Sequence, residues 1–209
     1  MNMFIKKNFL WILFFGSLIG LNESLIGSFN IPYRSVILST ITITLLSIAR
    51  QQIPKTGTSI LVILIAVLFK INNMGFSTCT TNVFLCGPSA ILLLGIGYEV
   101  FASLFDKKIT NKYLNLVIIC GITSIVAFSI FGVMNTYILH SWNTAMLSVY
   151  IFARAPMTAI ASSAMSIFVL YLIRTFRNEN FARWNPYVIN SIVGCMIIVF
   201  WLLGSFTIF

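Results

Sequence analysis

The chain has 209 residues, of which 59% are hydrophobic and 8% are charged, and its formal net charge at pH 7 is +9. A soluble domain cannot bury this much apolar surface, so the composition excludes a soluble globular protein and makes the lipid bilayer the expected solvent. The sequence also lacks the alternation of apolar and polar residues that marks a transmembrane β-barrel. We therefore expect an all-α polytopic membrane protein.

Long apolar runs separated by short polar connections predict about seven transmembrane helices. Each run is close to the ~20 residues that an α-helix needs to cross ~30 Å of hydrocarbon. In chain order the runs are 8–30, 34–53, 57–75, 84–105, 114–138, 156–175 and 187–208. A count of six spans stays open beside seven. No linker or soluble segment interrupts the series, which predicts a single integral membrane domain over residues 1–209.

The thirteen basic residues predict the orientation. Three fall on one side of the predicted spans: Arg34, Lys70 and Arg154. Ten fall on the side of the N-terminus: Lys6, Lys7, Arg50, Lys55, Lys107, Lys108, Lys112, Arg174, Arg177 and Arg183. The positive-inside rule therefore places the N-terminus in the cytoplasm, and we expect a multi-pass protein of the plasma membrane. Since the positive-inside rule accounts for most of the positive charge, the charge does not indicate a nucleic-acid partner, and none is expected.

Two acidic residues fall inside predicted spans, Glu23 in the outer half of the first and Glu99 in the inner half of the fourth. A charge at the bilayer centre costs about 2.5–3.5 kcal/mol on insertion scales, so each acid is expected to face a cation or a cavity. Glu23 could reach Arg34, Lys70 or Arg154. Glu99 could reach Arg50, Lys55 or Arg174. A structural ion pair is favoured for Glu99, whereas for Glu23 an ion pair and a place on a solute path are equally open.

The predicted outer connections, 71–83 and 139–155, combine neutral hydrogen-bonding groups with aromatic rings. Such groups line pockets for small organic solutes. Together with nearby charges they give these candidate solute-binding residues: Glu23, Arg34, Lys70, Asn73, Trp142, Asn143 and Arg154. Charged groups would fix the charge of the solute, asparagines would hydrogen-bond it, and the indole would stack on it. The alternative for Trp142 is an aromatic belt at the membrane interface.

The cysteines and the lone histidine predict little chemistry. Cys79 and Cys86 bracket the end of an outer connection and are interpreted either as a disulfide or as two free thiols. His140 is the single histidine and no C-x-x-C spacing occurs, so neither a metal site nor a cofactor is expected.

Two sequence patterns predict how the helices are related and where they approach closely. Spans three and six both begin with a proline-threonine-serine pattern, at 54–59 and 156–162, which predicts a weak 3+3 inverted repeat with the seventh helix appended. Small residues, Gly16 and Gly20 on the first span and Ala159 on the sixth, predict close packing, either within this chain or onto a partner subunit.

The length, the nearly loop-free helical body and the Gly16-x-x-x-Gly20 stripe, with the runs 54–70 and 86–99, resemble the S components of energy-coupling factor (ECF) transporters. These are substrate-binding membrane subunits, and the resemblance covers residues 8–175. It implies uptake of a small organic molecule and docking through the glycine stripe onto a membrane coupling subunit with ATPases. The chain departs from the family in having seven predicted spans where six are usual, and glycines where alanines are typical. No residue matches a known vitamin or metal pocket.

These observations favour a membrane subunit that binds and takes up a small solute. The sequence has no P-loop, no H-E-x-x-H motif and no cluster of carboxylates, so an enzyme is not expected. The alternative that the sequence leaves open is a non-transporting accessory subunit held by its small-residue stripes.

Overall fold

The structure, a computed structural model, describes residues 2–28, 31–73, 81–106, 109, 111–140, 142–177 and 186–206. The regular structure in these ranges is helical. The helices are α1 (Asn2–Ser28), α2 (Arg34–Gln52), α3 (Thr58–Asn73), α4 (Thr81–Phe105), α5 (Lys112–Val133), the π-helical turn η1 (Met134–Ile138), α6 (Thr144–Val149), the π-helical turn η2 (Tyr150–Arg154), α7 (Ala155–Arg177) and α8 (Pro186–Phe206).

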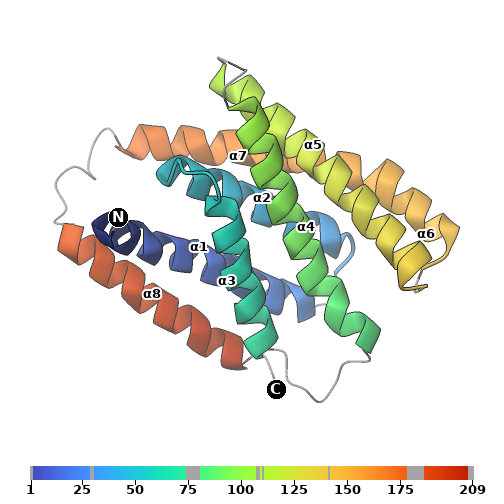
Figure 1. The fold of residues 1–209 in the computed structure, drawn as a ribbon, viewed down its shortest axis with the longest axis horizontal. Helices are drawn as coiled ribbons and strands as arrows, with labels where there is room; N and C mark the ends of the chain where they lie inside the picture. Colours follow the sequence, from blue (N-terminus) through green and yellow to red (C-terminus); the bar gives the residue numbers. More distant parts are fainter. Residues whose placement is uncertain are drawn as a thin grey trace.

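Seven long helices follow one another along the described chain, which confirms the predicted all-α fold (Figure 1). Helix α5 continues through η1 and ends at Ile138, as predicted. The next long helix begins much earlier than expected, because α6, η2 and α7 form one continuous helix from Thr144. The prediction of an outer connection over 139–155 was therefore wrong for most of its length. Asn143 explains the early start, because its Oδ1 accepts a hydrogen bond from Met146 N at 2.8 Å and caps the helix.

The described helices identify a multi-pass membrane protein. Five helical stretches are long and apolar enough to cross a bilayer: Asn8–Gly27, Gly87–Phe105, Lys112–Ile138, Thr144–Ile173 and Val188–Ser205. Helix α3 is apolar but shorter. Large apolar side chains cover much of the outer surface, as on α7, where Ile160 and Phe168 are exposed. Water would not tolerate such a surface, whereas lipid covers it at no cost.

Helix α2 lies at the centre of the bundle. It packs against α1, α3, α4, α5 and α7. Six of its 19 residues are serine or threonine, and this explains why it is less hydrophobic than its neighbours. Two of the hydroxyls bond to the carbonyl four residues earlier, Thr44 Oγ1 to Thr40 and Ser47 Oγ to Ile43, both at 2.8 Å. The helix is therefore polar in composition but surrounded by protein instead of lipid.

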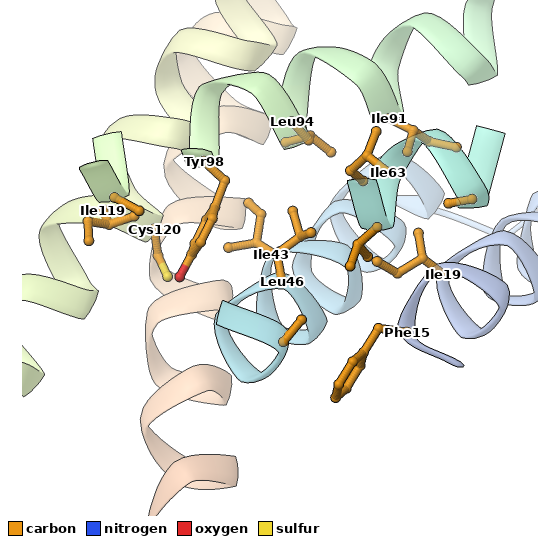
Figure 2. Packing of buried hydrophobic residues seen from close by; sticks show 14 of the residues in the cluster. Phe15, Ile19, Ile43, Leu46, Ile63, Ile91, Leu94, Tyr98, Ile119 and Cys120 are labelled. Carbon is orange, nitrogen blue, oxygen red and sulfur yellow. The ribbon is translucent and has the colours of Figure 1, made fainter. Parts of the chain in front are cut away.

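The apolar core runs through the same helices. Figure 2 shows Ile43 and Leu46 of α2 between the side chains of α3 and α4. Phe15 and Ile19 of α1 complete one end of this cluster. Helix α8 lies outside it and packs mainly on α1 (Figure 1), where Trp201 Nε1 donates a hydrogen bond to Ser17 Oγ at 3.0 Å.

The two halves of the bundle pack differently. In the first half α1 packs along α3, whereas in the second α5 is the helix that packs extensively against both α4 and α7. The predicted 3+3 inverted repeat gains no support from this packing and stays a prediction.

Candidate functional site

A buried ion pair joins α1 and α3 in the outer half of the predicted topology. Lys70 Nζ lies 2.6 Å from Glu23 Oε2, and about nine-tenths of each side chain is buried. Helix α4 makes room for the ammonium at Gly87, where a Cβ atom would lie 2.7 Å from Nζ. Three cations were candidate partners of Glu23, and the structure shows that Lys70 is the one that binds it. The two charges satisfy each other between three helices.

A second group of predicted residues gathers on the ring of Tyr150. The Arg154 guanidinium lies 4.4 Å from the ring centroid, and its Nη1 donates a hydrogen bond to Ser35 Oγ at 3.1 Å. Trp142 packs on the same ring with a centroid distance of 4.2 Å and also contacts Phe131. The Trp142 indole is therefore held by aromatic side chains of the protein.

Arg34 lies between these two groups. Its Nη1 donates a hydrogen bond to the Gly27 carbonyl at 2.8 Å. A Cβ at Gly27 would stand 3.8 Å from both Glu23 Oε2 and Lys70 Nζ, while the neighbouring Ser35 binds Arg154. The predicted charged residues therefore lie around the start of α2, where Glu23 and Lys70 bind each other. Arg34 and Arg154 are held instead by the Gly27 carbonyl and by Ser35 with Tyr150.

The remaining predicted residues have other positions. Asn143 is exposed and serves as the helix cap described above. The side chain of Asn73 lies outside the described residues, as do Cys79 and the side chain of Cys86, so a disulfide between these cysteines stays a prediction.

The small residues of α1 face into the bundle. A Cβ at Gly16 would lie 2.6 Å from Ile65 Cβ, and one at Gly20 would lie 2.7 Å from Phe69 Cβ, both on α3. These contacts with α3 support packing within the chain, one of the two alternatives for this stripe; docking onto a partner subunit stays a prediction. Ala159 is half-buried on α7, where its carbonyl accepts a hydrogen bond from Ser163 Oγ at 2.7 Å.

At the opposite end of the bundle, Glu99 joins three helices. Its Oε1 binds Arg50 Nη1 at 2.5 Å and accepts a hydrogen bond from Gly57 N at 2.7 Å. Its Oε2 accepts a hydrogen bond from Ser59 N at 3.0 Å. The carboxylate thus receives the free N–H groups at the start of α3, which favour negative charge. The predicted ion pair of Glu99 is present, and its partner is Arg50, one of the three candidate cations.

Arg50 also borders a large cavity. The cavity has a volume of about 510 Å³ and lies between α2, α4 and α5. Its lining is mixed: Ser47, Arg50, Gln51, Pro54, Tyr98, Asp106, Ile109, Lys112, Asn115, Leu116 and Ile119. A volume of ~300–1,000 Å³ with a few polar groups is typical of small-molecule sites.

The polar groups of this cavity are only partly satisfied by one another. Asp106 accepts hydrogen bonds from Asn115 Nδ2 at 3.1 Å and from Arg50 Nη2 at 3.4 Å. The Oδ1 atom of Asn115 is buried and has no hydrogen-bond partner in the described part of the chain. A buried acceptor without a donor is costly, so water or a ligand is expected to supply one.

Sequence reasoning placed the solute site at the other end of the bundle. The described cavity there is small, about 40 Å³, and is lined by Ser35, Ser39, Ala90, Leu94, Ala127, Phe128, Phe131 and Tyr150. Neither of these two cavities is lined by a residue of the predicted solute-binding set. Arg50, Lys112 and Asn115, which line the large cavity, were not among the predicted site residues. Little in the sequence singles out Arg50 and Lys112, because the positive-inside rule already accounts for basic residues at cytoplasmic helix ends.

No known protein family model matches the chain, and neither a curated protein nor a solved structure matches it. The fold and its exposed surface define a multi-pass α-helical membrane protein, and the comparisons add no support for membership of the ECF S-component family.

Proposed function

We propose that the protein is a membrane solute-binding or transport subunit, not an enzyme, and that its solute binds in the cavity between α2, α4 and α5. The observation that carries this proposal is the cavity itself. Its volume of about 510 Å³ suits a small organic molecule. Its lining offers a cation at Lys112, a carboxylate at Asp106 and an unpaired acceptor at Asn115 Oδ1.

The difference between the two ends of the bundle supports a transport role. The large cavity lies where α5 begins, at the end that the positive-inside rule assigns to the cytoplasm. At the other end, Phe128, Phe131, Trp142 and Tyr150 pack against one another. A carrier that faces the cytoplasm has this arrangement, with one end open and the other closed by side chains. Uptake of an S-component type, energised by a partner, is the more specific form of the proposal.

The first experiment is native mass spectrometry of the protein extracted gently from its own membranes. We expect a small organic molecule to be retained. The variants Lys112→Ala and Asn115→Ala should reduce its occupancy at least about tenfold, since each removes a contact of 1–3 kcal/mol. Trp142→Ala and Asn143→Ala, at the other end of the bundle, are the matched controls and should retain it.

Each other outcome has a definite meaning. Loss of the molecule in the Trp142 and Asn143 variants, but not in the cavity variants, would move the site to the outer end. Retained protein partners without any small molecule would contradict the proposal and favour the accessory-subunit alternative.

A further inference from the structure

Arg154, the last residue of the π-helical turn η2, has no carboxylate partner in the described part of the chain. The chain has four acidic residues, and three of them bind other cations: Glu23, Glu99 and Asp106. The fourth, Glu179, follows α7, whose end at Arg177 lies about 35 Å along the helix from Arg154. A cation within a membrane-spanning helix needs an opposite charge, so the counter-charge of Arg154 is expected from outside the chain.

The protein holds the Arg154 guanidinium and leaves one of its edges open. Its Nη1 donates a hydrogen bond to Ser35 Oγ at 3.1 Å, and its Cζ lies 4.4 Å from the centroid of the Tyr150 ring. Its Nε is buried and has no hydrogen-bond partner among the described residues. Nε and Nη2 together form the fork with which a guanidinium binds two oxygens of a carboxylate or phosphate. The group is therefore fixed in place for an oxyanion without being neutralised.

The position of Arg154 along its helix corresponds to the depth of lipid phosphates. The apolar stretch Thr144–Ile173 has 30 residues and is about 45 Å long, whereas the hydrocarbon layer is ~30 Å thick. Arg174 follows this stretch directly, and Arg154 lies about 20 residues before it, or ~30 Å along the helix. With Arg174 at one edge of the hydrocarbon, Arg154 therefore lies at the other edge, where the headgroups begin.

The exposed side chains near Arg154 agree with this depth. Phe152, two residues before it, is 80% exposed, and Ile160, further along the same helix, is 72% exposed. Aromatic side chains are typical of the membrane interface, and aliphatic side chains are typical of the hydrocarbon below it. The surface of the helix thus changes from interfacial to hydrocarbon-facing on passing Arg154.

The small cavity beside the guanidinium limits the size of what can enter. Ser35 and Tyr150, which both contact Arg154, line it together with Ser39. Its volume is about 40 Å³, and a water needs ~10–15 Å³ of such space, so it has room for two or three waters. A whole organic solute does not fit there. Most of any ligand of Arg154 therefore lies outside this cavity, on the surface of the helix.

We infer that Arg154 binds a phosphate oxyanion and that this oxyanion is the headgroup phosphate of a phospholipid, in the leaflet at the α6 end of the bundle (Figure 1). The guanidinium fork binds two phosphate oxygens, while the acyl chains lie along the exposed side of α7 that carries Ile160. Free inorganic phosphate offers the same oxygens but has no chains to occupy the hydrocarbon. This lipid site is separate from the solute cavity between α2, α4 and α5, and it does not depend on the proposed function.

The test is native mass spectrometry of the full chain in a non-ionic detergent. The protein is titrated with dioleoyl phosphatidylglycerol or with dioleoylglycerol, which has the same chains and no phosphate. Arg154→Gln removes the charge and the fork. Lys55→Gln is the matched control, because it removes the same charge from an exposed position beyond the other end of α2. We expect phosphatidylglycerol to bind the parent chain at least about tenfold more tightly than dioleoylglycerol, and Arg154→Gln to lose that preference while Lys55→Gln keeps it.

A thermal unfolding series separates loss of the site from loss of the fold. Arg154→Gln removes a charge that has no described counter-charge, so this variant should unfold at a temperature no lower than the parent chain when no lipid is added. Added phosphatidylglycerol should raise the midpoints of the parent chain and of Lys55→Gln, but not that of Arg154→Gln, since a ligand stabilises only the protein that binds it.

Equal binding of phosphatidylglycerol by the parent chain and Arg154→Gln would overturn the site, as would an equal loss in Lys55→Gln. Equal affinity of the parent chain for dioleoylglycerol would show that the phosphate is not recognised. Displacement of the lipid by inorganic phosphate at millimolar concentration would overturn the lipid assignment and identify a site for a soluble anion.

Discussion

At the scale of single residues, the two acidic residues within the predicted spans are each paired with a cation. Glu23 binds Lys70 and Glu99 binds Arg50, and each pair is largely buried. Glu99 receives two backbone N–H groups as well, so its charge is satisfied from three directions. Glu23 depends on Lys70 as its single described charge partner.

This dependence gives a stability prediction for Glu23→Gln. The substitution leaves the Lys70 ammonium buried without its counter-charge, so we expect the free energy of unfolding to fall by about 3–5 kcal/mol. The double variant Glu23→Gln with Lys70→Met removes both charges and should recover most of that loss. Unfolding of both proteins in the same detergent, followed by circular dichroism, measures the difference. A single variant as stable as the parent chain would show that the pair contributes little.

At the scale of helices, glycines set the distance between α1 and α3. A Cβ at Gly16 would meet Val62 O at 2.7 Å as well as the Ile65 side chain, and a backbone atom cannot move aside as a flexible side chain can. Close approach of this kind is what small residues provide in membrane bundles.

The helix-packing prediction compares two glycine substitutions. Gly16→Ala forces α1 and α3 apart and should destabilise the protein by about 1–3 kcal/mol, the usual cost of overpacking. Gly121→Ala is the matched control: a Cβ there meets no described atom within 4 Å, and alanine is the better helix former by up to about 1 kcal/mol. The two midpoints of thermal unfolding, measured in one detergent, should move in opposite directions. Equal destabilisation by both variants would contradict this explanation of the stripe.

The number and order of the long helices were predictable, because each contains an apolar run of about the length that crosses a bilayer. The early start of the helix at Thr144 was not, because it depends on the Asn143 cap and not on hydropathy. The depth of each acid in the predicted membrane left three candidate cations for Glu23 and three for Glu99. Choosing Lys70 or Arg50 from these sets required the packing of α3 and α4, and that packing depends on contacts between residues far apart in the sequence. The cavity was not predictable for the same reason, because its lining combines residues of α2, α4 and α5. The sequence of any one of these helices does not mark its own lining residues as part of a site.

At the scale of the whole molecule, the two ends of the bundle have different chemistry. Lys112 lies at the beginning of α5, beside the large cavity, and Met146 lies in α6, beyond the other end of the same helix. Both positions are exposed, so both suit chemical labelling.

The proposed orientation predicts which side of the membrane each position faces. On a cysteine-free background, Lys112→Cys should react with a membrane-impermeant maleimide in inverted vesicles but not in intact cells. Met146→Cys should show the reverse. The yield of labelled protein on a gel measures both. The opposite pattern would place the N-terminus outside and the large cavity on the external face.

The central position of α2 has a consequence for biosynthesis. The ribosome makes this hydroxyl-rich helix second, whereas α7, one of the helices that encloses it, is made much later. Until then α2 has no complete protein environment, and lipid does not satisfy its side chains. We therefore expect α2 to remain at the translocon beside α1 instead of partitioning alone, so that integration into the membrane and tertiary folding of this chain are completed together.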